Sequence, residues 1–415
     1  MILKSKQNYQ KIAMSAGFYP ENIVNAIDEL IKEGIVESKE GEMRLTNKGR
    51  QKIGDMPFYL FSEIDLDLLK AKLELAIKNM PDAHLLEYQW WFTCDTCIRL
   101  LGVLTENILL SNPKIAFIGA PILALAFNYA FPELEIYIYD ISQTILLYLE
   151  GKLSSTCKCV CIDVLNETKD EASNVKDNYF DIVFMDPPFY VEHYVAFIKL
   201  SNRMLSYGGD LYSTIFNENI KTNLRERKII FNEFCKNFTF ISMLNNEIFY
   251  NVPRFELNTY KAMGYNSEDI SDWRYNSLLY MKKNSYYSNE EDINIERGIW
   301  NEYCFNKKRI FVKTSISNCI NIEIGDWEIK PLYNEDCILK SVSRRYSERD
   351  KISLWTSDNE VFVVGRKGLA LVNEILTELE QNNKIDLSTL EVKYGIDDCD
   401  IHKFIDKLEE ITYGR

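Results

Sequence analysis

Short apolar runs alternate with stretches of helical spacing along the middle of the chain. The runs, each expected to form a strand, are 114–119, 135–140, 157–161, 180–185 and 211–215, followed by 238–245 and 277–282. Helices are predicted between them, at 122–129, 142–153, 195–205 (closed by Gly208 and Gly209) and around 231–234. Such alternation predicts a mainly parallel sheet with helices on both faces. We therefore expect an α/β domain over residues 111–285.

The residues before this domain predict a winged helix over 1–55 and connecting helices over 56–110. Apolar residues recur at helical spacing from Ile23 to Ile31, and short strands are expected at 34–37 and 43–46. A winged helix usually binds DNA. Here its helix carries the acids Glu21, Asp28, Glu29 and Glu33, which suit phosphates poorly. A dimerisation or scaffold role is the better prediction.

The residues after the α/β domain predict a polar linker over 283–292 and a small α+β domain over 286–415. A hairpin is expected at 353–364, turning at Asp358 and Asn359, and three helices should follow at 369–380, from 387 and over 397–410. This order resembles PqqD-like domains, in which a leader peptide adds a strand to the exposed edge of a hairpin. A second winged helix or a dimerisation domain is the favoured alternative.

Composition narrows the class of protein. Of the 415 residues 46% are hydrophobic, and no apolar run approaches the roughly 20 residues that span a bilayer. The first residues lack the apolar core of a signal peptide, so we expect a cytoplasmic protein with no membrane partner. The net charge of −14 argues against duplex nucleic acid as a partner. The charge is compatible with a cationic substrate, and equally with solubility alone.

Ten cysteines are scattered along the chain, which fits a reducing compartment. Cys94 and Cys97 have the spacing of a metal or redox pair. The natural partners would be Cys157, Cys159 and Cys161, which alternate along one strand instead of lying in turns. We therefore expect buried thiols and no metal.

The most informative stretch is the strand at 180–185 and the Asp186-Pro187-Pro188-Phe189 that ends it. Prolines cannot continue a ladder, so the chain must leave the sheet there. In open α/β sheets, ligands bind at the carboxyl ends of the strands. The Asp186 carboxylate and the Pro187 carbonyl can accept N–H bonds, and Phe189 and Tyr190 can form an aromatic wall. We expect an amine site; an ordinary turn capped by Asp is the alternative.

Two further acids follow the second and third strands. Asp140 suits the hydroxyls of a ribose, and Asp163 can accept from an adenine amino group. Each acid alone is compatible with a helix cap. All three in order, with Asp186, predict a nucleoside site.

The Asp-Pro-Pro-Phe motif resembles the Asp/Asn-Pro-Pro-Tyr/Phe signature of class I S-adenosylmethionine-dependent amino-methyltransferases. It also resembles the Asp-Pro-Pro-Tyr of branched-chain polyamine synthases (the N4-bis(aminopropyl)spermidine synthase family), which transfer an aminopropyl group. The second resemblance extends over residues 1–285. It includes an N-terminal winged helix and a Gln…Thr-x-x-Thr…Arg segment, matched here by Gln89, Thr93, Thr96 and Arg99, and it continues through Gly119 and Asp140.

These resemblances imply a Rossmann-like class I methyltransferase fold with a mainly parallel seven-stranded sheet. They also imply S-adenosylmethionine or its decarboxylated form as co-substrate. The residues implied in binding it are Gln89, Thr93, Gly119, Asp140, Asp163, Pro187 and Phe189.

The sequence departs from the resemblances at the first turn. That turn is usually rich in glycine, and in the polyamine synthases it carries an acidic cluster after its glycine. Here Gly119 is followed by Ala120, Pro121 and Ile122. The acids implied in holding a polyamine are therefore missing, and the fold carries over more safely than the acceptor.

The leading hypothesis is transfer of an aminopropyl group from decarboxylated S-adenosylmethionine to an amine of a polyamine-like molecule or a peptide side chain. N-methyl transfer is the alternative, and a non-catalytic binding scaffold is the alternative of another class. The candidate catalytic residues are Asp186, Tyr190 and His193.

The stretch holding Glu247, Tyr250, Arg254 and Glu256 is expected to form a lid over the acceptor. In it, Arg254 would suit a substrate carboxylate and Glu256 a substrate amine. The terminal domains are the candidates for a homodimer contact.

Overall fold

The computed structural model describes residues 20–39, 42–49, 64–107, 112–166, 174–216, 224–265, 274–284, 299–314, 324–333, 337–382, 385 and 387–413. The chain divides into two compact units, one made of Met1–Ile64 with Gly102–Asn112 and the other of Asp65–Leu101 with Pro113–Arg415.

The first unit contains one amphipathic helix and a hairpin. Helix α2 (Pro20–Lys32) precedes the antiparallel strands β1 (Val36–Lys39) and β2 (Glu42–Leu45), and Ile27, Ile35, Val36 and Met43 form its small core. Residues 47–49 are helical. Because 1–19 and 50–63 lie outside the described residues, the winged helix stays a prediction.

A seven-stranded sheet forms the centre of the second unit, in the order β5-β4-β3-β6-β7-β9-β8. The strands are β3 (Lys114–Ile118), β4 (Glu135–Asp140), β5 (Cys157–Cys161), β6 (Phe180–Met185), β7 (Leu205–Phe216), β8 (Phe238–Phe249) and β9 (Tyr275–Lys283). The first five strands are parallel, and β9 runs antiparallel between β7 and β8. The predicted α/β fold, a Rossmann-like class I methyltransferase fold, is confirmed.

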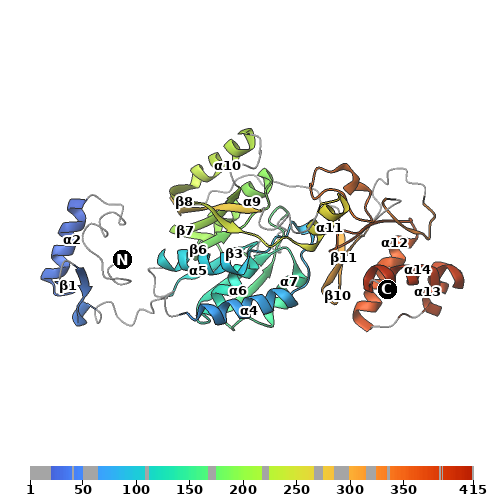
Figure 1. Ribbon diagram of the computed structural model, residues 1–415, viewed down its shortest axis with the longest axis horizontal. Helices are drawn as coiled ribbons and strands as arrows, with labels where there is room; N and C mark the ends of the chain where they lie inside the picture. Colours follow the sequence, from blue (N-terminus) through green and yellow to red (C-terminus); the bar gives the residue numbers. More distant parts are fainter. Residues whose placement is uncertain are drawn as a thin grey trace. The chain divides into compact units, whose positions relative to one another are not determined.

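Helices cover both faces of this sheet (Figure 1). Helices α4 (Leu66–Asn79), α6 (Pro121–Ala130) and α7 (Gln143–Glu150) lie on one side, while α9 (Val191–Met204) and α10 (Leu224–Asn237) lie on the other. Side chains alternate along β3. Phe117 meets Phe127 of α6, whereas Ala116 and Ile118 face the core that includes Phe197 of α9. The period of two in the apolar runs thus produces two buried faces.

Between residues 299 and 413, the described segments form a second sheet with helices against it. The sheet order is β10-β11-β13-β14-β12, all antiparallel. Its strands are β10 (Trp300–Phe305), β11 (Lys308–Lys313), β12 (Ile329–Pro331), β13 (Leu354–Thr356) and β14 (Val361–Val364), and its helices are α12 (Gly368–Asn382), α13 (Leu387–Tyr394) and α14 (Asp398–Tyr413). We call this part the C-terminal domain.

The C-terminal domain packs on the segment that precedes α5 (Cys94–Asn107) and on α11 (Arg254–Ala262). Trp355 and Val361 of its sheet share one apolar cluster with Leu85 and with Phe255 of α11, and Trp90 and Trp91 pack at the border of that cluster. This cluster buries Trp355, covers part of Trp90 and Trp91, and joins the C-terminal domain to the segment that precedes α5.

Three predictions about the chain path need correction. Gly208 and Gly209 do not close a helix but lie inside β7, because α9 ends at Met204 and the chain pairs with β6 at once. Lys283 ends β9 and is buried, so it does not open the linker; residues 285–292 are outside the described residues. The hairpin is present, but β11 and β12 pair with its two outer edges, so it offers no free edge to a leader peptide.

No helix among the described residues is long and apolar enough to cross a membrane.

Candidate functional site

Asp140 ends β4, Asp163 and Asp186 follow β5 and β6, and the three acids meet in one pocket at the carboxyl edge of the sheet. We call it the acid-lined pocket. Parallel strands bring their ends to the same edge, which explains why residues far apart in sequence converge here. The pocket is lined by Glu87, Tyr88, Gln89, Trp90, Trp91, Ile118, Gly119, Tyr139, Asp140, Ile141, Ile162, Asp163, Val164, Leu165, Asp186, Pro188, His193 and Phe197.

A second pocket, of about 300 Å³, adjoins the first and shares Asp186, Pro188, Tyr88 and Trp90 with it. We call it the aromatic pocket. Its other lining residues are Pro187, Phe189, Tyr190, Tyr250, Arg274, Ser341, Val342 and Ser343. The last three come from the C-terminal domain. Asp186 therefore lies where two cavities meet, which is the position needed by a group that acts between a donor and an acceptor.

Hydrogen bonds orient the Asp186 carboxylate. Thr214 Oγ1 donates to Asp186 Oδ1 at 2.6 Å, and Tyr250 OH donates to the same oxygen at 2.8 Å. Asn276 Nδ2 in turn donates to Tyr250 OH at 2.8 Å, which fixes the phenol. No hydrogen bond from a described residue reaches Oδ2, so this oxygen is available to accept a hydrogen bond from a ligand.

Burial raises the pKa of Asp186 to about 7, against the opposing effect of the hydrogen bonds from Thr214 and Tyr250. Near neutral pH the carboxyl group can therefore both hold and release a proton, as a general base must. Burial and the neighbouring Asp186 raise the pKa of Tyr250 well above its ordinary value, so the phenol stays protonated and donates.

Gly119 permits the close approach of β3 and β6 at the pocket. Its φ is +67°, and a Cβ at this position would lie 3.0 Å from the Asp186 carbonyl oxygen and 3.3 Å from the Phe197 ring. Only glycine adopts this backbone without strain. Pro121 begins α6 directly after the turn and brings no N–H of its own.

Asp140 is held by the turn that begins α7. Ser142 N–H donates to Asp140 Oδ1 at 2.9 Å, and Ser142 Oγ caps α7 by accepting from Ile145 N–H at 3.3 Å. Burial raises the pKa of Asp140 to about 6. Asp163 lies opposite, and its two oxygens accept from Leu165 N–H and Asn166 Nδ2, both at 3.1 Å.

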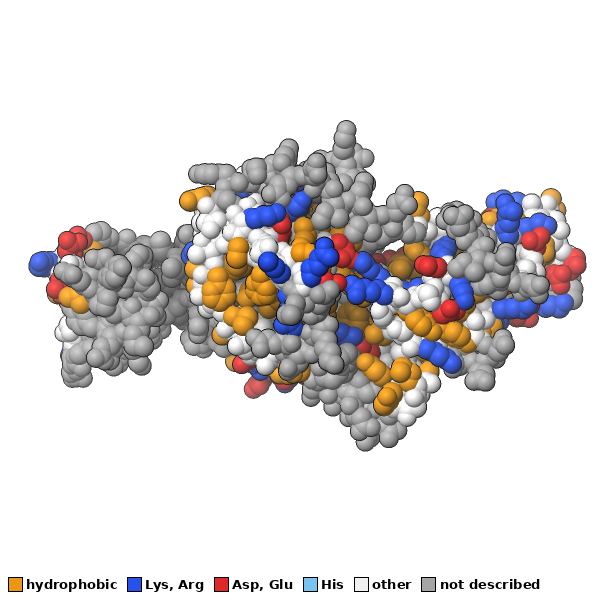
Figure 2. Space-filling model, turned by 90° about the horizontal axis from the view of Figure 1, so that it is seen from above, with side chains coloured by type: hydrophobic (Ala, Val, Ile, Leu, Met, Phe, Trp, Pro, Cys, Tyr) orange, Lys and Arg blue, Asp and Glu red, His pale blue; other side chains and the backbone are white. Residues whose placement is uncertain are grey.

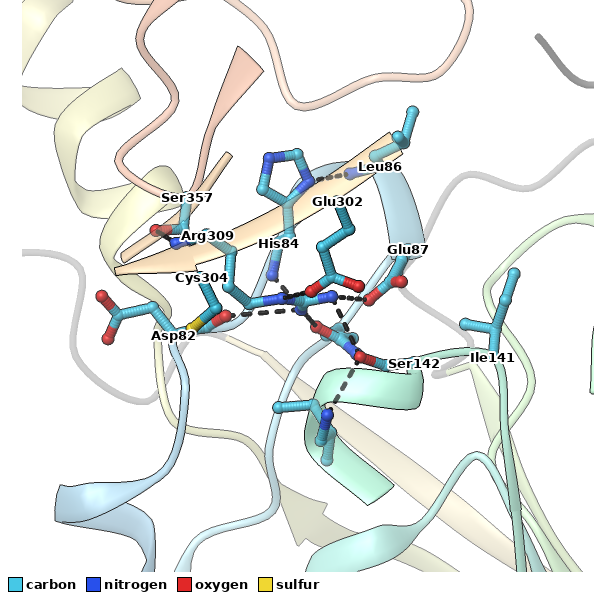
Figure 3. A network of polar contacts seen from close by, with 12 residues as sticks. Asp82, His84, Leu86, Glu87, Ile141, Ser142, Glu302, Cys304, Arg309 and Ser357 are labelled. Carbon is cyan, nitrogen blue, oxygen red and sulfur yellow. Dashed lines mark hydrogen bonds and ion pairs between the residues drawn. The ribbon is translucent and has the colours of Figure 1, made fainter. Parts of the chain in front are cut away.

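A buried polar network lies behind the acid-lined pocket (Figure 3). Its centre is Arg309 of β11, whose side chain is fully buried and contacts Glu302, Glu87, Gln89 and Ser142. Burial raises the pKa of Glu87 to about 7, although the Arg309 charge opposes that rise. The C-terminal domain thus places a cation beside two residues of the pocket lining.

Arginines surround the aromatic pocket. Arg274 pairs with the fully buried Glu256 and lies over the Trp90 ring at 4.3 Å. Arg344 lies over Tyr190 at 4.5 Å, and Arg349 lies over Tyr88 at 5.6 Å. On the face shown in Figure 2, Lys and Arg side chains gather beside hollows that have hydrophobic side chains in them. A ligand in the aromatic pocket would meet both ring faces and positive charge.

Most of the predicted site residues line the two pockets. Asp186, Gln89, Gly119, Asp140, Asp163 and His193 line the first, and Pro187, Phe189 and Tyr190 line the second. His193 lies on α9 and is buried.

Thr93 is the exception, because it lines neither pocket. Its Oγ1 accepts from Thr96 N–H at 3.1 Å and so caps α5.

The expected lid is only partly correct. Tyr250 lines the aromatic pocket, but Arg254 pairs with Asp82 and Asp358, and Glu247 pairs with Arg99. Glu256 is committed to Arg274 and to the indole N–H of Trp90. Arg254 and Glu247 are therefore structural, since their partners lie outside the pocket lining, whereas Glu256 holds two residues of that lining, Arg274 and Trp90.

Sequence reasoning missed several residues of the site. Glu87, Tyr88, Trp90 and Trp91 stand next to the predicted Gln89, and the density of aromatic residues there was an available signal. Arg274, Arg309 and the 341–343 segment carried no such signal, because nothing in their local pattern points to a sheet edge formed by other residues.

A family model described as "Probable N6-adenine methyltransferase" matches residues 85–262, which is less than half of the chain. The matched stretch contains the three acids, the Asp-Pro-Pro-Phe turn and the order of strands that carries them. The chain is a class I S-adenosylmethionine-type transferase.

No curated protein matches this transferase in sequence. Among solved structures, it is similar to the branched-chain polyamine synthase of Thermus thermophilus, a structure that contains N4-aminopropylspermidine and 5'-methylthioadenosine. The identity is 12%, the TM-score is 0.47, and the match covers 71% of this chain and 88% of that one.

A putative RNA methyltransferase of Pyrococcus horikoshii is 14% identical with a TM-score of 0.36, covering 52% of this chain and 98% of that one. A predicted O-methyltransferase of Agrobacterium tumefaciens is 17% identical with a TM-score of 0.30, covering 42% and 74%. Among the described residues of this transferase, no three His, Cys, Asp or Glu side chains are grouped as a metal site.

Stability of the transferase should depend on pH through Asp186. The pKa of this carboxyl group is about 7 in the folded chain and 3.8 ordinarily, so the folded state holds the proton more tightly. Stability therefore falls as pH rises from about 4 to about 7 and is level above. Asp186→Asn removes this titration. The difference between the free energies of unfolding of the variant and of wild type should therefore shift in favour of the variant by about 2 kcal/mol between pH 5.5 and pH 8.

Denaturant unfolding of both proteins at three pH values measures this effect. Asp350→Asn, at an exposed carboxylate, is the control for simple removal of a charge. A pH-independent difference between wild type and Asp186→Asn would contradict the prediction.

Proposed function

We propose that this protein is an S-adenosylmethionine-dependent N-methyltransferase whose acceptor is the exocyclic amine of a flat heteroaromatic ring of the adenine type. The observation that supports it most directly is the Asp186 carboxylate, with Oδ2 available, at the junction of an acid-lined pocket and an aromatic pocket. The match of residues 85–262 to an adenine N6-methyltransferase model supports the same acceptor class.

The chemistry needs an acceptor for the N–H bonds of the amine. The lone pair of an aromatic exocyclic amine is delocalised into the ring, and hydrogen bonds from N–H to Asp186 and to the Pro187 carbonyl would make it more available for attack. The nitrogen then attacks the methyl carbon in line. The carbon–sulfur bond breaks, its electron pair goes to sulfur, S-adenosylhomocysteine leaves, and the nitrogen gives up a proton to Asp186. A carboxyl pKa of about 7 suits that transfer.

The surroundings of the aromatic pocket favour a neutral ring over a polycation. Tyr88, Trp90, Phe189 and Tyr190 offer ring faces on which a base can stack, an interaction of about 1–3 kcal/mol per base. Arg274 lines the same pocket, and Arg344 and Arg349 lie over two of its rings. Arg274 is paired with Glu256 and Arg344 with Glu192, so Asp186 is the one acid of this lining that is left for a polyamine. The acids expected to hold a polyamine after Gly119 are absent from the sequence.

The donor is supported by the acid-lined pocket. Asp140 would accept from the ribose hydroxyls, and Asp163 from the adenine amino group of the donor, as in other nucleoside-binding sheets. Gln89 supplies an amide beside them. His193 lies in the same lining, where it can help to receive the proton that the acceptor loses.

Aminopropyl transfer from decarboxylated S-adenosylmethionine is the second candidate, and one observation favours it. Of the charged residues that line the acid-lined pocket, all are acids: Glu87, Asp140, Asp163 and Asp186. A donor without the α-carboxylate would suit such a lining better than S-adenosylmethionine itself.

Mass spectrometry separates the two candidates. We expect incubation with S-adenosylmethionine and adenosine, AMP or a short adenine-containing oligonucleotide to add about 14 Da to the acceptor nitrogen nucleophile, whereas aminopropyl transfer to spermidine or a lysine peptide would add about 57 Da. The Asp186→Asn protein is the matched control. A product with spermidine and none with any adenine acceptor would favour the second candidate. Absence of any product and of any donor binding by calorimetry would contradict both.

A further inference from the structure

We propose that Arg309, a residue of the C-terminal domain, is a positioning residue for the adenosyl donor. It lies on β11, and it acts on Gln89 and on the turn before α7, both at the acid-lined pocket. The proposal rests on the proposed function only for the kind of donor. Neither the acceptor nor the group transferred enters into it.

The guanidinium is held in a fixed orientation by four side chains (Figure 3). Nε donates to Glu302 Oε1 at 2.5 Å, and Nη2 donates to Glu87 Oε2 at 2.5 Å and to Ser142 Oγ at 2.9 Å. Nη1 donates to Gln89 Oε1 at 2.6 Å. Planar donors in a rigid fork can satisfy these partners at once, which an ammonium cannot do.

The contact with Gln89 determines which way its amide points. Gln89 Oε1 accepts from Arg309 Nη1 and, at 3.1 Å, from His84 N–H. If the amide were reversed, its N–H2 group would face two other donors, Arg309 Nη1 and His84 N–H. The amide oxygen must therefore lie on the side of these two groups. Nε2 is buried and has no hydrogen-bond partner among the described residues, while Gln89 lines the acid-lined pocket. Arg309 therefore presents the amide N–H2 group to a ligand in that pocket.

A fixed donor group in that position complements the carboxylates of the acid-lined pocket. Glu87, Asp140, Asp163 and Asp186 accept hydrogen bonds when ionised. An adenosyl donor carries acceptors, namely ribose oxygens, ring nitrogens and, in S-adenosylmethionine, a carboxylate. The Gln89 N–H2 group would bind one of these.

Arg309 also supports Asp140, the expected partner of the ribose. Ser142 Oγ accepts from Arg309, and Ser142 N–H donates to Asp140 Oδ1 at 2.9 Å. The turn between β4 and α7 is thus held from behind by a residue of another domain. Removal of the guanidinium would loosen both the donor amide and the acceptor carboxylate of the pocket.

Calorimetry with S-adenosylhomocysteine and 5'-methylthioadenosine tests the proposal in the full-length chain. We expect Arg309→Lys to weaken binding by about tenfold or more, because the ammonium cannot hold Gln89 together with Glu87 and Ser142. Gln89→Glu should weaken binding as much. Its carboxylate still accepts from Arg309 and His84, so unfolding should occur at no lower denaturant concentration than in wild type, but it offers the pocket an oxygen in place of N–H2.

Lys308→Gln is the matched control. Lys308 is the neighbour of Arg309 on β11, pairs with Glu360 at 2.8 Å and lines neither pocket. Its affinity should stay within about twofold of wild type. Folded Arg309→Lys and Gln89→Glu proteins that bind both ligands like wild type would overturn the inference and leave the proposed function intact. Wild-type protein that binds neither ligand would overturn both.

Discussion

Asp186→Asn is expected to lower kcat by about 10³-fold and to change donor affinity little. The asparagine Oδ1 can still accept from Thr214 Oγ1 and Tyr250 OH, so the side chain should keep its place. What changes is the other end of the group. An N–H2 group now faces the acceptor amine. This group can neither accept a hydrogen bond from the amine nor take its proton. Single-turnover rates at saturating donor, with calorimetry of S-adenosylhomocysteine, separate the chemical step from binding.

Tyr250→Phe provides a graded comparison with Asp186→Asn. The Tyr250 hydroxyl lowers the pKa of Asp186, so its removal should raise that pKa and move the rising limb of the pH–rate profile to higher pH. The carboxylate form is the active one, and the wild-type rate should therefore rise with pH through about 7.

An Asp186→Asn enzyme that turns over at the wild-type rate would remove the basis for a catalytic role of this residue.

Glu256→Ala is expected to destabilise the fold by about 3–5 kcal/mol. The Glu256 carboxylate is fully buried, accepts from Arg274 Nη2 at 2.6 Å and Nε at 2.9 Å, and accepts from Trp90 Nε1 at 2.8 Å. Its removal would leave the Arg274 charge without its counter-ion in a site that is mostly shielded from water. Denaturant unfolding gives the free energy directly.

The same substitution should weaken acceptor binding, because Trp90 and Arg274 line the aromatic pocket. Glu247→Ala is the matched control. Glu247 pairs with Arg99, but both side chains are substantially exposed, so we expect a change within about 1 kcal/mol. An equal loss of stability in the two variants would show that the Glu256 pair has no special weight.

The central sheet and its three acids could be predicted because they follow from local pattern. Each apolar run marks a strand, and each acid lies at or just beyond the end of its run. Parallel connections then bring Asp140, Asp163 and Asp186 to one edge without further information. The end of the strand before Asp186 could be predicted in the same way, since two prolines must end a strand.

The rest of the site depends on contacts that local pattern does not encode. Arg309 lies 220 residues along the chain from Gln89. Local sequence does not distinguish a buried arginine in a strand from a solvent-exposed one. Thr93 shows the opposite error. A helix cap and a ligand-binding hydroxyl use the same side chain. The family motif suggested ligand binding, but in the structure Thr93 Oγ1 accepts from Thr96 N–H and acts as the cap.

The residues 341–343 that wall the aromatic pocket also bear on the order of biosynthesis. Chains grow from the amino end, so Asp186 and the strands around it leave the ribosome well before this wall and before Arg309. A nascent chain can thus complete its central sheet while its cleft still has one side open to solvent. Selection among acceptors would therefore have to wait for the C-terminal domain, whose residues 341–343 complete the wall of the aromatic pocket.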